Sequence, residues 1–328
     1  MRAVICRAWG AVEDLTIEEV PAPAPAADEV LIDVRATSVN YADSIMVAGK
    51  YQTRPPFPFS PGLETAGVVT RCGDGVTRFR PGDRVMATLA YGGLAEQAVA
   101  KESETFAIPD GMSFDEAGAF PIAYISSDVA IRWQGRLEAG ETLLVLGAAG
   151  GVGLTAVEIG KAMGARVIAG ASTAEKLAVA REHGADDLVN YATEKLTDRV
   201  MALTDGKGAD VCFDPVGGEL FDAALSALGW GGRILVVGFV GGVQQIPANR
   251  LLVKNRSAMG TSLRYFRWHA PDKLRRSVDE LLRWYEEGKL RPCISRRLPL
   301  ERSVEAIKLL TDRRAFGKVV VVPELKGD

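Results

Sequence analysis

The chain has 328 residues, of which 47% are apolar and 25% charged, and its formal net charge is −3. These values are typical of a globular protein with two domains, and they exclude the basic excess of a chain whose main partner is nucleic acid. No stretch approaches the ~18 consecutive apolar residues of a membrane span, and the four cysteines are too scattered for a disulfide framework, which favours a cytoplasmic protein.

The first 122 residues are predicted to be rich in β-strands. The N-terminal "MRAVICRAWG" is typical of a first strand and lacks the apolar core of a signal peptide. The strand-like runs "EVLIDVRATSV", "TAGVVTRC" and "DRVMATLA" follow, separated by Gly, Pro and Asp. Ser113 and Glu116 then form a capping-box pattern, which predicts that a helix begins just before the character of the sequence changes.

Strand-like and helical stretches alternate between residues 123 and 262. "TLLVLGA" precedes the helical pattern "LTAVEIGKAMGA", "RVIAGAS" precedes "AEKLAVAREHGA", and the strand-like "ADVCFDPVGG" precedes the helical "ELFDAALSALGW". The strands are near-continuously apolar, as strands buried on both faces are. The alternation predicts an α/β fold with a doubly wound parallel sheet of the Rossmann type. Beyond it, apolar spacing predicts amphipathic helices at residues 274–285 and 304–310, and "KVVVVP" predicts a final strand.

The glycine-rich stretch "LLVLGAAGGVG", residues 143–153, follows a strand and opens a helix. In such a unit glycines allow a tight turn, a close approach to a pyrophosphate and helix–strand packing, and the phosphate lies on the helix N-terminus. The spacing is that of G-x-G-x-x-G with Ala148 in the first position, Gly150 in the second and Gly153 in the third. The turn predicts a dinucleotide site. The expected contacts are Ala148, Ala149, Gly150, Gly151, Val152 and Gly153.

The end of the next strand indicates which dinucleotide binds. An NAD enzyme usually carries an acid about 20 residues after the turn, where it binds the ribose 2′-hydroxyl. Here "GAST", residues 170–173, occupies that place without a carboxylate, and Lys176 follows. Small residues, hydroxyls and a lysine suit a 2′-phosphate, which predicts NADPH. The alternative for Lys176 is a solvated helix residue.

Nearly the whole chain resembles a known family. The resemblance rests on stretches such as "SVNYADSIMVAGKY", "FPFSPGLETAGVV", "FRPGDRVMA", "GAAGGVGLTAVEIGKAMGARVIA" and "FGKVVVV". They are similar to zinc-independent medium-chain dehydrogenases/reductases of the quinone oxidoreductase (zeta-crystallin-like) group. The resemblance implies a β-rich GroES-like catalytic domain, formed by residues 1–122 and 263–328, around a Rossmann NADP-binding domain at residues 123–262. It also implies a cofactor cleft between the domains and a homodimer. The long strand-like stretch at 232–253 favours a dimer too, because an edge strand needs covering.

Zinc-dependent relatives carry Cys and His ligands that are missing here. Leu63 stands at the histidine position in "GLE", "TSVNYADS" has no cysteine, and "YGGLAEQ" replaces the loop that holds structural zinc. The chain's two histidines, His183 and His269, lie apart from any Cys or acid pattern. Asp43 and Glu64 are interpreted as structural hydrogen-bonding or ion-pairing groups. We therefore expect no metal.

The resemblance also implies roles for individual residues. Asn40 is expected near the nicotinamide, and Tyr51 is expected to line the same pocket, with a packing aromatic as the alternative. Ser172, Lys176 and Tyr191 are expected at the 2′-phosphate and adenosine end. Gly238, Phe239 and Val240 are expected at the nicotinamide ribose. Asn255 and Arg313 are expected elsewhere in the cofactor cleft. The adjacent Arg314 leaves the register at Arg313 open.

The expected chemistry is direct hydride transfer from NADPH to a small molecule, an NADPH:quinone oxidoreductase activity. A quinone, or the β-carbon of an enone, spreads the arriving charge onto a conjugated oxygen, so no Lewis acid is needed. Water or Tyr51 would supply the proton. Reduction of an enone or enoyl thioester stays open, and "RYFRWHAPDKLRR" would then bind coenzyme A unless it is only a solvated helix start. An NADPH-binding protein with little turnover also stays open.

Overall fold

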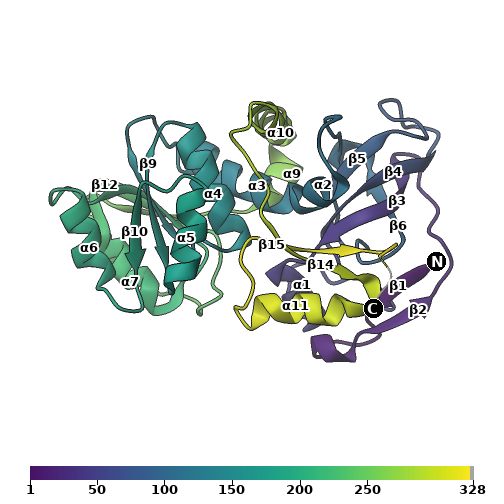
Figure 1. Cartoon of the computed structure of the whole chain (residues 1–328), viewed down its shortest axis with the longest axis horizontal. Coiled ribbons are helices and arrows are strands. Elements are labelled where there is room, and N and C mark those ends of the chain that lie inside the picture. Colours follow the sequence, from purple (N-terminus) through teal and green to yellow (C-terminus); the bar gives the residue numbers. More distant parts are fainter. Residues whose placement is uncertain (326–328) are drawn as a thin grey trace. The chain divides into compact units, whose positions relative to one another are not determined.

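The computed structural model describes residues 1–325 and divides into two compact units. The first unit consists of Met1–Ile122 together with the chain from Pro292 onward, and the second is the continuous segment Ala123–Arg291. Figure 1 shows the yellow C-terminal strands β14 (Ile294–Pro299) and β15 (Lys318–Val322) beside the purple strand β3 (Glu29–Ser38). The chain leaves the first unit once and returns to it once.

The first unit is built on a seven-stranded sheet. Its order is β14-β15-β3-β4-β5-β7, with β6 also paired to β3, and every pair except β14–β15 is antiparallel. The remaining strands of this sheet are β4 Glu64–Cys72, β5 Arg84–Thr88, β6 Gln97–Lys101 and β7 Thr105–Ala107. A separate antiparallel pair consists of β1 Arg2–Ile5 and β2 Thr16–Glu19. The helices of this unit are α1 Tyr41–Val47, α2 Phe114–Ala119 and α11 Ser303–Thr311. The β-rich domain expected from the sequence is confirmed.

The second unit is built on a six-stranded sheet in which every pair is parallel. Its order is β10-β9-β8-β11-β12-β13, which is the order 3-2-1-4-5-6 of the Rossmann fold. The strands are β8 Thr142–Leu146, β9 Arg166–Ala171, β10 Asp187–Asn190, β11 Ala209–Asp214, β12 Leu228–Val236 and β13 Ser257–Gly260. The doubly wound parallel sheet is confirmed, and its strand order reverses between β8 and β11.

Helix α3 (Pro121–Asp128) begins at the boundary of the units and precedes β8. The helices that connect the parallel strands are α4 Gly151–Ala162, α5 Ala174–Glu182, α6 Leu196–Leu203, α7 Gly218–Ala227 and α8 Ala248–Leu252. Sequence reasoning did not name α6, although Leu196 and Val200 bury one face of it in the core of this unit. The capping box at the start of α2 is present as predicted, with Ser113 as its N-cap and Glu116 as its partner.

Residues 263–291 belong to the second unit and not, as the sequence predicts, to the C-terminal part of the catalytic domain. They form α9 (Leu263–His269) and α10 (Pro271–Glu286). The indole N–H of Trp133, in a π-helical segment after α3, donates a 2.9 Å hydrogen bond to Ser277 of α10. Arg132 of the same segment stacks over the Trp284 ring. These contacts attach α10 to the second unit.

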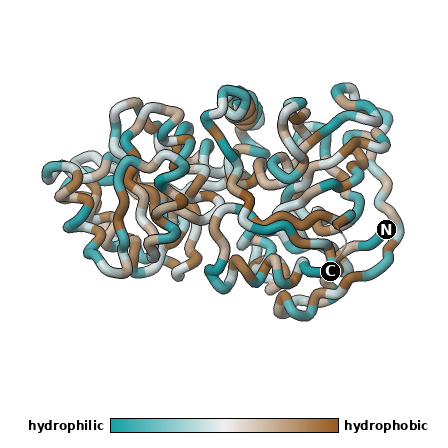
Figure 2. The backbone as a smooth tube through the Cα atoms, viewed as in Figure 1, coloured by the Kyte–Doolittle hydropathy of each residue, from teal (hydrophilic) through white to brown (hydrophobic). Residues whose placement is uncertain are grey.

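Apolar side chains fill the centre of each unit. Figure 2 shows brown, apolar segments along the central strands and teal segments mainly in helices and loops. In the second unit Leu144, Ile168 and Cys212, from three neighbouring strands, are fully buried in one cluster. Within residues 1–325, no helix combines the length and apolar character that a bilayer crossing requires.

Two buried glutamates accept hydrogen bonds from residues that lie where the chain passes from one unit to the other. In the first unit, Oε2 of Glu64 accepts the N–H of Ile122 at 2.7 Å. In the second, Glu158 of α4 accepts the Tyr124 hydroxyl at 2.6 Å and the N–H of Arg291 at 3.1 Å. His183 Nδ1 also lies 2.6 Å from Glu158. One carboxylate therefore contacts both ends of the second unit.

Candidate functional site

A glycine turn joins β8 to α4. Gly147 has a φ of +57°, a left-handed conformation that favours glycine, and its carbonyl oxygen accepts the N–H of Gly150 at 2.9 Å. A Cβ atom on Gly153 would lie 2.2 Å from that same oxygen, so the helix packs this closely only because residue 153 is glycine. Ala148 and Ala149 are both buried. Gly147, which sequence reasoning did not single out, thus takes the tight-turn role of the missing first glycine.

The first turn of α4 presents backbone donors at the end of the sheet. Gly150 is the N-cap and has no side chain that could occupy these donors. Helix geometry leaves the N–H groups of Gly151, Val152 and Gly153 without an acceptor inside the helix. The turn follows β8 beside β11, where the strand order reverses and where doubly wound sheets bind ligands. These donors suit a phosphate or pyrophosphate.

The predicted 2′-phosphate and adenosine residues lie together at the next strand ends. β9 ends at Ala171, which pairs with Asn190 at the end of β10. Ser172 directly follows β9, and Tyr191 follows β10 and donates its N–H to the carbonyl of Ala171 at 3.1 Å. Lys176 is half-buried in the first turn of α5. The structure therefore brings Ser172, Lys176 and Tyr191 to the carboxyl-terminal ends of β9 and β10.

Thr173 also lies at these strand ends, and the sequence analysis gives it no role. It is the N-cap of α5, and its hydroxyl oxygen accepts the N–H of Lys176 at 3.3 Å. The signal was a threonine just before a helical pattern, which is a common N-cap arrangement. The cap sets the start of the helix that carries Lys176.

A second glycine turn follows β11. Oδ1 of Asp214 accepts the N–H groups of Val216 and Gly217, both at 2.8 Å, and burial raises the pKa of this carboxyl group. The turn packs against Gly238, where a Cβ atom would lie 2.8 Å from the carbonyl oxygen of Pro215. Sequence reasoning used "DPVGG" only as a strand end. Its paired glycines after an apolar strand were the available signal.

The other predicted cofactor residues lie in loops. Phe239 and Val240 follow β12, and the Phe239 side chain is half exposed. Asn255 is exposed beyond α8 in the second unit, with a φ of +51°. Arg313 is exposed beyond α11 in the first unit, with a φ of +58°. The roles of these four residues stay predictions.

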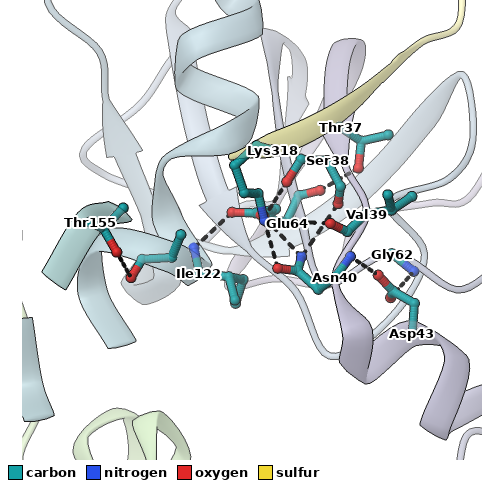
Figure 3. Close-up of polar contacts among 11 residues, drawn as sticks. Thr37, Ser38, Val39, Asn40, Asp43, Gly62, Glu64, Ile122, Thr155 and Lys318 are labelled. Carbon is teal, nitrogen blue, oxygen red and sulfur yellow. Dashed lines mark hydrogen bonds and ion pairs between the residues drawn. The ribbon is translucent and has the colours of Figure 1, made fainter. Parts of the chain in front are cut away.

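A buried polar cluster surrounds Asn40 in the first unit (Figure 3). Oε1 of Glu64 accepts hydrogen bonds from Asn40 Nδ2 at 2.9 Å, from Lys318 Nζ at 3.0 Å and from the Ser38 hydroxyl. Lys318 also donates to Asn40 Oδ1 at 2.7 Å. Glu64 is fully buried, and Asn40 and Lys318 are 8% and 7% exposed. Sequence reasoning missed Lys318, which lies in the strand pattern "FGKVVVV".

Asp43 lies next to this cluster in the first turn of α1. Its carboxylate accepts the N–H of Asn40 at 2.7 Å and the N–H of Gly62 at 3.0 Å. Burial raises the pKa of Asp43 to about 7, against the lowering effect of the two hydrogen bonds. Asp43 and Glu64 therefore both serve as hydrogen-bond acceptors, which is how the sequence analysis interpreted them.

Apolar packing occupies the histidine position of the zinc-dependent relatives. Leu63 is 5% exposed and lies in a buried cluster with Val39 and Val319. Tyr51 packs against the same cluster, as its packing alternative requires, and its catalytic role stays a prediction. In the described part of the chain, no three His, Cys, Asp or Glu side chains are grouped so that they could hold a metal ion.

Comparisons with known proteins cover both units. Residues 26–110 match the alcohol dehydrogenase GroES-like domain, and residues 151–284 match the family described as zinc-binding dehydrogenase. A quinone oxidoreductase-like protein 2 homolog from Nematostella vectensis is 39% identical over 98% of this chain and 88% of its own length. Two solved structures resemble the chain with a TM-score of 0.92, each over 98% of this chain and 100% of the other. One is a mycobacterial protein complexed with NADPH, at 30% identity, and the other is Escherichia coli quinone oxidoreductase complexed with NADPH, at 26% identity.

Proposed function

Because the chain belongs to the quinone oxidoreductase family of zinc-independent medium-chain dehydrogenases/reductases, we propose that it transfers a hydride from NADPH to a quinone. The observation that carries the cofactor assignment is the glycine turn at the switch point of a Rossmann sheet, followed by a β9 end without a carboxylate. The solved relatives complexed with NADPH support the same assignment.

The residues of the second unit fit NADPH. The N–H groups at the start of α4 bind the pyrophosphate, and Gly153 allows the helix to approach. Ser172 donates a hydroxyl hydrogen bond to the 2′-phosphate, and Lys176 pairs with its charge. Tyr191 lies beside them at the adenosine end. When bound, NADPH supplies the hydride, and these residues hold it in place.

The substrate side of the site selects an acceptor that needs no metal. Hydride addition to a quinone places negative charge on a conjugated oxygen, which water or a weak acid can protonate. Leu63 and its apolar neighbours offer no ligands for a Lewis acid at this position. Asn40 and Tyr51 orient the reacting groups, so the contribution of the protein is mainly positioning.

A second candidate function is the reduction of an enone or enoyl thioester. The surface of α9 favours it: Arg264 stacks on Trp268 with 4.0 Å between the guanidinium carbon and the ring centroid, and Tyr265 is more than half exposed. Arginine and aromatic faces of this kind bind nucleotide phosphates and bases, as coenzyme A would present.

The deciding experiment is NADPH oxidation with a panel of quinones beside a panel of enones and enoyl thioesters. Turnover of quinones with the higher kcat/KM supports the proposal. Turnover of enoyl thioesters alone would transfer the assignment to the second candidate. Tight NADPH binding without turnover of either panel would identify an NADPH-binding protein instead.

We further propose a cytoplasmic homodimer formed through the second unit. β13 is one of the two edge strands of the parallel sheet, and an edge of this kind needs covering. Large apolar side chains that are at least two-thirds exposed gather in sequence around β12 and β13: Trp230, Val243, Leu252 and Val253. Exposed apolar side chains of this size are typical of interfaces, and a second copy of the chain would bury them.

A further inference from the structure

The Asn40 side chain ends in a primary amide, which can flip between two orientations of nearly equal shape. We propose that Lys318 and Glu64 are positioning residues that hold this amide in a single orientation, an inference that rests on the proposed role of Asn40. Neither of them needs to touch the substrate or cofactor.

The charges of Lys318 and Glu64 match the two ends of the Asn40 amide. Its oxygen lies 2.7 Å from the ammonium nitrogen of Lys318, and its nitrogen lies 2.9 Å from a carboxylate oxygen of Glu64. A flipped amide would place its N–H donors against the ammonium and its oxygen against the carboxylate. Two attractive, charge-assisted hydrogen bonds would become two repulsive contacts. Burial strengthens both effects, because little water is present to screen the charges.

Stability alone does not explain the pair. A buried ammonium and carboxylate lose their hydration, and an apolar pair of similar volume is often as stable or more stable. Val39 and Val319, the chain neighbours of Asn40 and Lys318, are already buried in an apolar cluster. What charges provide and methyl groups cannot is direction: they distinguish the oxygen end of the Asn40 amide from its nitrogen end.

The fixed orientation defines what Asn40 offers to a ligand. Both N–H groups of its amide point to protein acceptors, Glu64 at 2.9 Å and the carbonyl of Ser38 at 3.4 Å. Its oxygen uses one lone pair for Lys318 and has a second one. Asn40 thus acts as an acceptor for an N–H or O–H donor, such as a carboxamide or a ribose hydroxyl.

The orientation can be measured without any turnover. The chain has four asparagines, so selective ¹⁵N-asparagine labelling of the whole protein yields four side-chain amides. Asn40→Asp identifies the signal of residue 40 by its disappearance. We expect the two Asn40 protons to exchange slowly with water in the wild type. In Lys318→Met both signals should shift, and exchange should accelerate at least tenfold. Unchanged Asn40 signals in a folded Lys318→Met protein would overturn the proposal.

Two further variants separate positioning from folding. Lys308→Met removes a lysine of the same unit whose partner, Glu13, is exposed, and it should leave the Asn40 signals unchanged. If Lys318→Met does not fold, because it leaves Glu64 unpaired, the double variant Lys318→Met/Glu64→Gln removes both charges. That protein should fold and show a mobile or doubled Asn40 signal. A single slowly exchanging signal in it would also contradict the proposal.

The kinetic test is a double-mutant cycle on the hydride-transfer rate in single turnovers with the best acceptor. Lys318→Met should slow the step about tenfold while the Kd for NADPH changes less than twofold. In an Asn40→Ala background it should cause no further loss, because the lysine acts through Asn40. Additive losses would show that it does not. If no acceptor is reduced, the proposed function fails, and the amide signals still decide the orientation.

Discussion

The backbone N–H of Asn40 donates a 2.7 Å hydrogen bond to Oδ2 of Asp43, three residues further along the chain. The contact begins α1 and fixes the backbone of the residue that is proposed to face the reaction. Asp43 is fully buried and accepts a second hydrogen bond, from Gly62. A group that is both buried and ionisable makes the stability of this region depend on pH.

Asp43 should lower the stability of the first unit as pH rises. Burial raises its pKa to about 7 in the folded chain, whereas an unfolded aspartate has a pKa of about 3.9. Between these values the folded state holds a proton that the unfolded state releases, so its stabilising contribution is complete below pH ~4 and is lost as pH rises towards 7. Thermal unfolding midpoints at pH 5 and pH 8 should differ less in Asp43→Asn than in the wild type. The exposed Asp28→Asn should keep the wild-type difference, and an unchanged difference in Asp43→Asn would contradict the assignment.

Lys176→Ala should weaken NADPH binding tenfold to a hundredfold and hardly change NADH binding. A hydrogen bond to a charged group contributes about 1.5–3 kcal/mol, and each decade of affinity corresponds to ~1.4 kcal/mol. Titration of both cofactors measures the effect, with the exposed Lys195→Ala as the control in the same unit. Equal losses for the two cofactors would show that Lys176 does not contact the phosphate.

A carboxylate at the end of β9 should reverse the cofactor preference. Ala171 stands where NAD enzymes place their acid, but its side chain is 1% exposed, so Ala171→Asp would also bury a charge. Ser172→Asp introduces the charge one residue later, at a partly exposed position. It should weaken NADPH by repulsion and leave NADH binding equal or better. NADPH binding that survives this change would place the 2′-phosphate elsewhere.

Alanine substitution of Gly150 and of Gly153, in the turn before α4, should have different effects on stability and on NADPH binding. A Cβ atom at Gly153 would lie 2.2 Å from a backbone oxygen, whereas one at Gly150 would lie 3.3 Å from it. Gly153→Ala should therefore lower the unfolding midpoint by several degrees. Gly150→Ala should leave that midpoint nearly unchanged and weaken NADPH, because its methyl group would occupy the space of the pyrophosphate. Gly111→Ala, which meets no atom within 4 Å, serves as the control for both measurements.

Charge placed beside the β13 edge should separate the proposed dimer. Leu252 is 78% exposed and Val253 is 68% exposed, so glutamate at either position fits a monomer but not a buried interface. Light scattering at micromolar concentration should find a dimer for the wild type and a monomer for Leu252→Glu/Val253→Glu. Ile17→Glu, on an exposed strand of the first unit, should remain dimeric. A wild-type protein that is monomeric in this measurement would contradict the proposed dimer.

The sheets were predictable from the sequence because their signals are local. The apolar runs of β8 and β9, and the glycines between β8 and α4, lie within about thirty residues and identify each other. The placement of α9 and α10 was not predictable in this way. An amphipathic helix shows which face it buries but not which core it joins, and here the Trp133–Ser277 contact decides, across 144 residues.

Lys318 shows the same limit at the candidate site. Next to a run of valines it has the pattern of a strand start, and no acidic residue lies within five positions of it in the sequence. Its partners, Asn40 and Glu64, precede it by more than 250 residues and are reached only because β15 pairs with β3. The glycine turn could be found from spacing, whereas this cluster required the fold.

Glu158 gives the second unit the character of an insertion. Tyr124 and Arg291, at the start and the end of Ala123–Arg291, contact the same carboxylate, so the entry and exit of this long segment nearly coincide. A host domain that receives such a segment needs to open only one surface loop, and its own strands can pair as if the segment were a short connection. The interruption of one domain by the other in the sequence therefore does not hinder the folding of either domain.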